Sequence, residues 1–457
     1  MKRVLMQNYF EKLFKTSYLL FVLISFNVFF ARHWYIPHLS YVIVALGVVV
    51  GIMRLLHVRD YLNVGVFLLL SFVCSYALGA VNSFDYGYID NVKAVVWMLI
   101  QYFLIFAFDK NADYSKERDI IFAVILVYTC VSAIISITMM LMRWQYYSLV
   151  DGMYWVLGGF VDNRLWGVYT DPNYGAILSI VSIVISLFYL TGDGSKDKRI
   201  KAVLVINIVL EYLYLCYADS RTGLLAVVAA VVIACVLWVS KSKGFARSIA
   251  LAIVLSTILV VGSYGIRNLT SAARVEIAKI SATRAGMSQE EIAMEMDLAR
   301  VGRVDEQIGG GTDVTNNRIA IWGNAIEIFK QHPIVGISYR NIREYAYDKI
   351  PDTYAEFESM HNFFFDILVS QGIIGVAILF MLMGWVIWTL IKKYKDLTDY
   401  REFAFMMAII AAIFASMLTY SETFYMNTGG AFIFWYVLGY LVNYKEKDQE
   451  KVEIVEV

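Results

Sequence analysis

Long apolar segments alternate with short polar connections along most of the chain. A bilayer core about 30 Å thick is crossed by roughly 20 residues of α-helix, and about twelve segments approach that length and character. They lie near residues 16–31, 36–53, 60–81, 91–108, 119–142, 173–191, 200–217, 222–239, 248–266, 361–390, 402–420 and 429–443. The pattern predicts an all-α polytopic membrane protein with about twelve transmembrane helices.

The connection between the ninth and tenth segments is much longer than the others. It begins with the charge-mixed, amphipathic stretch AARVEIAKISATRAGMSQEEIAMEMDLARVGRV, is interrupted at GGGT, and resumes with the helical pattern NNRIAIWGNAIEIF. Asn316 is placed to cap that helix and Pro333 to end it. We therefore expect a membrane domain over 1–266, a helical loop domain over 267–360, and a second membrane domain with a tail over 361–457.

Composition and charge agree with this class and add an orientation. Hydrophobic residues make up 59% of the chain and the mean hydropathy is +0.60. The formal net charge of zero gives no reason to expect nucleic acid as a partner. Basic residues collect in alternate connections such as KDKRIK and SKSKGFAR, whereas YSETFYMNTGG has none. The positive-inside rule therefore predicts a multi-pass protein of the inner or plasma membrane, with both termini cytoplasmic and the long loop extracytoplasmic.

The first apolar segment is followed by RHWYIP rather than by a small-residue cleavage site, so we expect the chain to insert without losing a signal peptide. The four cysteines lie inside apolar segments without CxxC pairing, which indicates neither a disulfide framework nor a zinc site. Few ionisable residues interrupt the apolar segments, and Glu211 and Asp366 are the main exceptions. Intramembrane charge usually marks an ion or proton path, so its scarcity argues against a proton-coupled transporter.

Three arginines break the positive-inside pattern on the predicted outer side. Arg164 lies in DNRLWGVYTDPNYGA, Arg221 in DSRTG, and Arg318 begins the helix of the long loop. A planar guanidinium at the lipid interface matches phosphate oxygens in bidentate fashion, so an anionic lipid head group is the expected partner. Ordinary ion pairs are the alternative: Arg164 with Asp162, Arg221 with Asp219, and Arg318 with Glu327.

His361 opens the tenth apolar segment, in ESMHNFFFDILVSQGIIG. Glu358 precedes it by three positions, so the two side chains would share one helix face if the helix starts early enough. A carboxylate beside a histidine fixes the tautomer or favours the imidazolium, which suits a general base. Asp366 is expected to be a weaker partner. The alternatives are an interfacial or capping role for His361 and a helix-dipole role for Glu358. His332, in QHP, reads as a helix stop.

The segments RLWGVYTDPNYGA, DSRTGLLA, NNRIAIWGNAIEIFKQHPIVGI and HNFFFDILVSQGIIG resemble, in this order and sidedness, the successive motifs of the O-antigen ligase and polymerase superfamily (the Wzy/WaaL type). Together with the twelve segments and the large outer loop, the resemblance covers most of the chain. The family usually has a leucine shortly after HN, whereas this chain has HNFFF, which we interpret as a packing variation.

The resemblance implies a metal-independent glycosyltransferase without a cofactor, acting at the outer leaflet on a glycan linked to undecaprenyl diphosphate. Arg164 and Arg221 would hold the diphosphate, and Arg318 would assist it or the incoming glycan. His361, tuned by Glu358, would act at the acceptor hydroxyl. The expected partners are this lipid-linked glycan, an acceptor glycan, the bilayer and other polysaccharide-export proteins.

Polymerisation of repeat units into a capsule, exopolysaccharide or O-antigen is favoured over ligation to a lipid A core or wall acceptor. A lipid-linked oligosaccharide transporter would need charged residues along the spans, which the sequence largely lacks. A membrane acyltransferase that used His361 alone would leave the three arginines unexplained.

Overall fold

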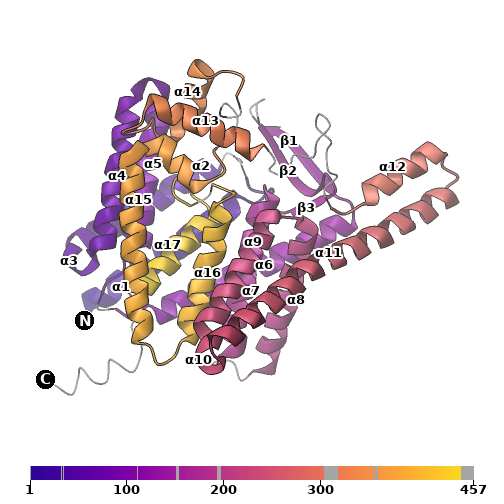
Figure 1. Ribbon diagram of the computed structural model, residues 1–457, viewed down its shortest axis with the longest axis horizontal. Helices are drawn as coiled ribbons and strands as arrows, with labels where there is room; N and C mark the ends of the chain where they lie inside the picture. The colour runs from indigo at the N-terminus through magenta and orange to yellow at the C-terminus, as the bar shows by residue number, and fades with distance from the viewer. Residues whose placement is uncertain are drawn as a thin grey trace.

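The computed structural model describes residues 2–31, 33, 35–110, 112–150, 154–192, 197–302, 317–353, 355, 359–421 and 423–443. Long helices form a bundle, and a small sheet and several short helices lie at one end of it (Figure 1). The helices are α1 (Lys2–Ser25), α2 (Tyr35–Leu55), α3 (Val58–Tyr61), α4 (Val64–Asn82), η1 (Phe84–Tyr86), α5 (Tyr88–Leu99), η2 (Ile100–Ile105), α6 (Ser115–Leu141), α7 (Pro172–Thr191), α8 (Lys198–Ala218), α9 (Arg221–Ala234), η3 (Cys235–Val239), α10 (Ser240–Lys243), α11 (Phe245–Arg284), α12 (Gln289–Ala299), α13 (Arg318–Gln331), η4 (Tyr339–Asn341), α14 (Ile342–Lys349), α15 (Phe363–Lys395), α16 (Arg401–Met417) and α17 (Gly429–Val442).

Each of the predicted apolar segments coincides with a helix, which confirms an all-α polytopic membrane protein. Within the described residues, nine helical segments are long and apolar enough to cross a membrane. The other three segments correspond to α1, which carries Glu11, Lys12 and Lys15, and to the shorter helices α16 and α17 of 17 and 14 residues. The number of spans therefore stays a prediction.

A three-stranded antiparallel sheet occupies the connection between α6 and α7, where we expected no strands. Its strands are β1 (Gln145–Val150), β2 (Tyr154–Val161) and β3 (Arg164–Gly167), in the order β1-β2-β3. Asp162 and Asn163 form the β2–β3 turn with φ angles of 49° and 58°, as a two-residue hairpin turn with two left-handed residues requires. We call the end of the bundle with this sheet, α13 and α14 the loop end.

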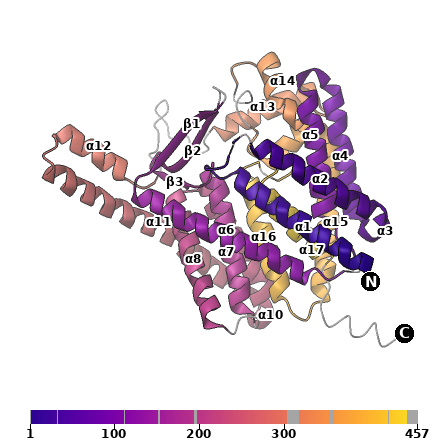
Figure 2. The same cartoon turned by 180° about the vertical axis from the view of Figure 1, so that it is seen from behind.

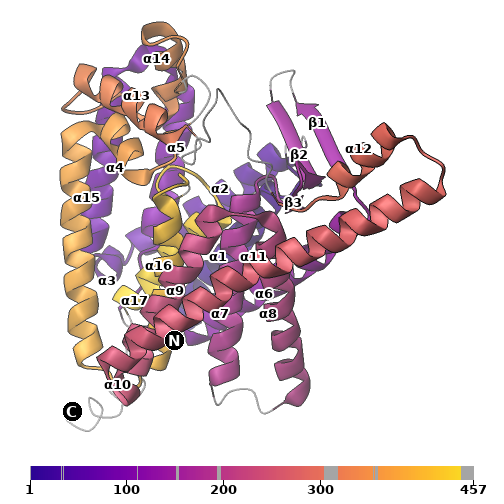
Figure 3. The same cartoon turned by 45° about the vertical axis from the view of Figure 1, so that its right-hand side comes forward.

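Helix α11 is 40 residues long, or about 60 Å, and runs through the predicted domain boundary between residues 266 and 267 without a break. Together with α12, which folds back along it, it projects from the bundle as an arm (Figure 3). The predicted GGGT interruption and Asn316 lie outside the described residues. Asn317 occupies the N-cap position of α13, and the helix ends at Gln331, two residues before Pro333.

Charged residues near the start of the chain are buried in ion pairs. Lys15 pairs with Glu117 at 2.8 Å, and Arg54 pairs with Glu11 at 2.8 Å. All four side chains are at most 5% exposed. The two pairs join α1 to α6 and to α2, whose arrangement is visible from behind in Figure 2.

Helix α15 is interrupted at Gly372, where φ is +58°. The loop after α13 fits into this interruption. Ile337 and Ser338 donate backbone N–H groups to the carbonyls of Val369 and Ser370, and Ile373 donates to the carbonyl of Pro333. A Cβ atom at Gly372 would lie 2.5 Å from the Ile334 carbonyl, so only glycine fits here. The contact fixes α13 against α15.

We predict that Gly372→Ala lowers the free energy of unfolding by about 1–3 kcal/mol, because it combines a left-handed φ with a backbone clash. Thermal unfolding of the purified chain in nanodiscs measures this effect. Gly384→Ala in the same helix is the control, since its Cβ meets nothing within 4 Å. That control should be neutral or slightly stabilising, and equal losses in both variants would contradict our explanation.

Candidate functional site

Three of the helices that begin at the loop end are capped by a polar side chain at the first turn. Asp171 accepts the N–H groups of Asn173 and Tyr174 at the start of α7, at 2.6 and 3.1 Å. Ser220 accepts the N–H of Gly223 at the start of α9, at 2.9 Å. Its hydroxyl also donates to Asn173 at 2.8 Å, which ties these two helix starts together.

Asn362 caps the third of these helices, α15. Its side-chain oxygen accepts the N–H groups of Phe364 and Phe365 at 2.9 and 3.4 Å. Asparagine before an apolar run is a strong N-cap signal, because its side chain satisfies N–H groups that the first turn leaves unpaired. Helix α15 therefore starts at Phe363, two residues after His361.

The C-terminal end of α16 joins α9, α13 and α15. Arg318 Nη2, at the first residue of α13, donates to the Thr419 carbonyl at 2.9 Å. Asn362 Nδ2 donates to the Leu418 carbonyl at 3.0 Å. The Thr419 hydroxyl lies 2.9 Å from that of Thr222 in the first turn of α9. The starts of three helices, with Arg221 and Arg318, are thus gathered around Leu418 and Thr419.

Arg164 belongs to the same region through α8. Its Nε donates to the Ala218 carbonyl at 3.0 Å and its Nη2 to the Asp219 carbonyl at 3.4 Å. These carbonyls lie immediately before the start of α9, next to Arg221. The Asp219 carboxylate forms an ion pair with Arg267 of α11. The structure therefore places all three predicted arginines at the loop end.

His361 has a φ of +48° and lies outside the helix. Asn362 starts the helix after His361, so the condition of an early helix start is not met, and the pairing of His361 with Glu358 stays a prediction. Glu358 itself lies outside the described residues. The His361 ring is half-buried, and its charge interacts with the carboxylates of Asp171 and Asp366. We expected Asp366 to be a weaker partner of His361 than Glu358. The Asp366 side chain is buried, and its Oδ1 accepts the Met360 N–H at 3.1 Å.

Asp171 is a residue of this region that our sequence reasoning missed. Burial raises the pKa of its carboxyl group, and the N–H groups of Tyr174 and Asn173 and the charges of Arg164 and His361 oppose that rise. Asp171 therefore lies within electrostatic range of one predicted arginine and of the histidine. The sequence carried a usable signal, because aspartate followed by proline before an apolar run is typical of an N-cap and first helical residue.

His332 ends α13, as predicted from QHP. Its Nδ1 lies 3.2 Å from the Asn82 amide nitrogen, and its Nε2 lies 3.1 Å from the Tyr345 hydroxyl. Burial lowers the pKa of the ring, which favours the neutral form with one accepting and one donating nitrogen. Both nitrogens thus hold α13 against its neighbours.

Metal ligands do not gather in the part of the chain that the structure describes. No group of three or more His, Cys, Asp or Glu side chains there could hold a metal ion. Cys74, Cys130, Cys216 and Cys235 are all free thiols.

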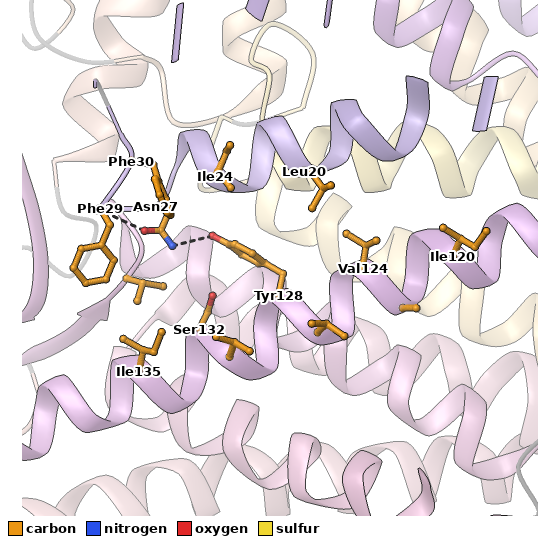
Figure 4. Close-up of a pocket in the computed structure, with 14 residues that line it drawn as sticks. Leu20, Ile24, Asn27, Phe29, Phe30, Ile120, Val124, Tyr128, Ser132 and Ile135 are labelled. Carbon is orange, nitrogen blue, oxygen red and sulfur yellow. Dashed lines mark hydrogen bonds between the residues drawn. The ribbon is translucent and has the colours of Figure 1, made fainter. Parts of the chain in front are cut away.

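A groove of about 710 Å³ lies between α1 and α6 (Figure 4). Its walls are mostly apolar and include Leu20, Ile24, Ile120 and Ile135. A polar spot interrupts them where Asn27 Nδ2 approaches the Tyr128 hydroxyl at 3.4 Å.

One end of this groove lies beside the segment that leads to α7. Val168 lines the groove, and its carbonyl accepts the Val28 N–H at 2.6 Å. The Thr170 N–H donates to the Phe26 carbonyl at 3.1 Å. The groove therefore ends three residues before Asp171, whose carboxylate interacts with Arg164 and His361.

Residues 204–380 match the family model described as O-Antigen ligase. The matched segment begins in α8, ends in α15, and includes Arg221, Arg318 and His361. A search of curated proteins found no match. This similarity agrees with the predicted resemblance to the O-antigen ligase and polymerase superfamily over these residues. It supports a membrane enzyme that polymerises or ligates glycans.

We predict that Asn362→Ala destabilises the protein by about 1–2 kcal/mol, because it removes the cap of α15 and the bond to Leu418. Thermal unfolding is the measurement. Asn362→Asp should lose less stability, since it keeps the capping oxygen and removes only the amide donor. An alanine variant as stable as the parent would show that the cap contributes nothing.

Proposed function

We propose that this chain, with its O-antigen ligase segment, polymerises oligosaccharide repeat units carried on undecaprenyl diphosphate into a surface polysaccharide at the outer leaflet. One observation carries the proposal. Four residues that are far apart in the sequence lie close to the starts of helices or strands at the loop end, and contacts of these residues or of their neighbours connect those starts. The four are Arg164, Arg221, Arg318 and His361. The capsule, exopolysaccharide or O-antigen would be the product.

An anionic group suits this region for two physical reasons. The starts of α7, α9, α13 and α15 bring the positive ends of four helix dipoles to this region. The three arginines add positive charge that does not depend on pH. During glycosyl transfer, negative charge grows on the departing diphosphate, so fixed positive charge there stabilises the transition state most. Metal-independent catalysis is consistent with this arrangement.

His361 is proposed to accept the proton of the acceptor hydroxyl. As the acceptor oxygen bonds to the anomeric carbon, the bond between that carbon and the diphosphate oxygen breaks, and the diphosphate leaves with the electron pair. The imidazolium formed in this step would be stabilised by the charges of Asp171 and Asp366, which already interact with the ring. The two carboxylates take the role first assigned to Glu358.

The groove between α1 and α6 is proposed to hold the polyprenyl chain of the donor. Its apolar walls suit a hydrocarbon chain, and Ile120 and Ile135 lie about 22 Å apart along α6, a large part of the bilayer core. Its end beside Val168 would place the diphosphate close to Asp171, Arg164 and His361. This continuity favours a lipid-linked donor.

The loop end is proposed to face outward, as the distribution of basic residues predicts. The termini would then be cytoplasmic, and the donor would be used after its translocation. The description of the matched family favours ligation to a lipid A core or wall acceptor as the second candidate function. The two reactions share the donor chemistry and differ only in the acceptor.

We predict that His361→Ala lowers the rate of glycan extension by about 10² to 10⁴, the usual contribution of a general base. Arg221→Ala should lower it by about 10² to 10³, through loss of charge stabilisation. Gel analysis of glycan chain length in the producing strain, with matched protein levels, measures both effects. Lys93→Ala is the control, because Lys93 is exposed and pairs only with neighbouring Asp90 among the interactions described. Normal long glycan in both site variants would refute a glycosyltransferase centred on these residues.

Filling the groove should weaken donor binding without changing the chemical step. We expect Val131→Trp to raise KM for the lipid-linked donor by about tenfold, equivalent to about 1.4 kcal/mol, with kcat nearly unchanged. Val254→Trp on α11 is the control, because Val254 has the same exposure of about half and lies outside the groove. If Val131→Trp has the parent KM while His361→Ala is inactive, the groove assignment is wrong and the proposed reaction stands.

A further inference from the structure

A cluster of buried polar side chains lies in the middle of the bundle, where α6, α7 and α8 meet. Thr129 belongs to α6, Ser179 and Ser182 to α7, and Asn207 and Glu211 to α8. All five residues are at most 2% exposed. Asn207 and Glu211 are four positions apart, so they lie on one face of α8. Each of the three helices is a candidate membrane span, which places the cluster away from both ends of the bundle.

Thr129 and Asn207 donate hydrogen bonds within this cluster. Thr129 Oγ1 donates to Ser182 Oγ at 2.7 Å. Asn207 Nδ2 donates to Ser182 Oγ at 2.9 Å and to Ser186 Oγ at 3.0 Å. These bonds fix the positions of the Thr129, Ser182 and Asn207 side chains.

Several acceptors remain without a donor. Among the described residues, neither carboxylate oxygen of Glu211 makes a hydrogen bond, and the same holds for Asn207 Oδ1 and Ser179 Oγ. The hydroxyl groups of Ser179 and Thr129 are the polar neighbours of the carboxylate. A buried unsatisfied polar group costs about 1–3 kcal/mol, and a buried unpaired charge costs more. The Glu211 carboxyl group must therefore be either protonated or balanced by a bound cation.

We propose that Glu211, Ser179, Asn207 and Thr129 form a binding site for a monovalent cation, Na⁺, in the membrane core. One carboxylate balances one positive charge, whereas a divalent ion would leave an excess charge in a medium of low dielectric constant. The atoms that would bind the ion are all oxygen atoms, which hard cations prefer as ligands. Ionisable residues within membrane spans commonly mark ion sites.

The site lies below the region assigned to glycosyl transfer. Tyr169 is fully buried, and its ring contacts those of Tyr174 and Tyr214. Its hydroxyl lies within electrostatic range of Glu211 and makes no hydrogen bond among the described residues. Tyr169 precedes Asp171 by two positions. A bound cation would therefore stabilise α7 just below the residues that interact with Arg164 and His361.

The test compares thermal unfolding of the full chain in nanodiscs in NaCl and in N-methyl-D-glucamine chloride at equal ionic strength. We expect Na⁺ to raise Tm of the parent in a concentration-dependent way. Glu211→Gln should abolish the Na⁺-dependent shift, and Ser179→Ala should move it to several-fold higher Na⁺. Asp90→Asn, which removes an exposed carboxylate, is the control and should keep the shift unchanged.

Binding of radioactive ²²Na⁺ to the parent protein decides the matter if the Gln variant does not fold. About one Na⁺ per chain is expected. No bound Na⁺, together with equal Tm values in the two salts, would show that Glu211 carries a proton instead and would overturn the proposal. Neither readout depends on glycosyl transfer, so the outcome is independent of the proposed function.

Discussion

The last carbonyl groups of a helix have no partner within the helix, and inside a membrane protein water cannot always supply one. Just after α16, the carbonyls of the C-cap residue and of the next residue are satisfied by side chains from elsewhere in the chain. Leu418 accepts from Asn362, and Thr419 accepts from Arg318. The same bonds place the starts of α13 and α15 beside α16. The positions of His361 and Arg318 therefore follow from satisfying one helix end, and Arg318 has a structural role as well as a proposed functional one.

The helices could be predicted because apolar length is a local property, and each predicted segment coincides with a helix. The sheet could not, since its pairing depends on the turn at Asp162 and Asn163 and on contacts across short strands. The expected position of His361 at the start of the helix was wrong for a different reason. Asn362 is a strong N-cap and caps the helix, which therefore starts after the histidine. That signal was present in the sequence and was given too little weight.

Sequence order indicated that Arg164, Arg221, Arg318 and His361 belong to the same end of the molecule, but it could not show how they meet. Their hydrogen bonds go to backbone carbonyls, such as those of Ala218 and Thr419. Every residue has a backbone carbonyl, so the sequence does not indicate which one will accept a bond. The buried pairs of Glu11 and Lys15 were hidden for a related reason. A charged residue near the end of a predicted span is expected to face solvent unless its partner is known. The partner of Glu11 is 43 positions away and that of Lys15 is 102 positions away.

The length of α11 has a mechanical consequence. At about 60 Å the helix is about twice as long as the bilayer core is thick. Its Arg267 is fastened to Asp219, in the turn whose carbonyls also hold Arg164 and whose next helix starts with Arg221. This ion pair therefore ties α11 to the α8–α9 turn. A movement of α11 at Arg267 would be transmitted to this turn, while the bond from Arg274 to the Met140 carbonyl and the ion pair of Arg143 with Glu295 hold the arm to α6.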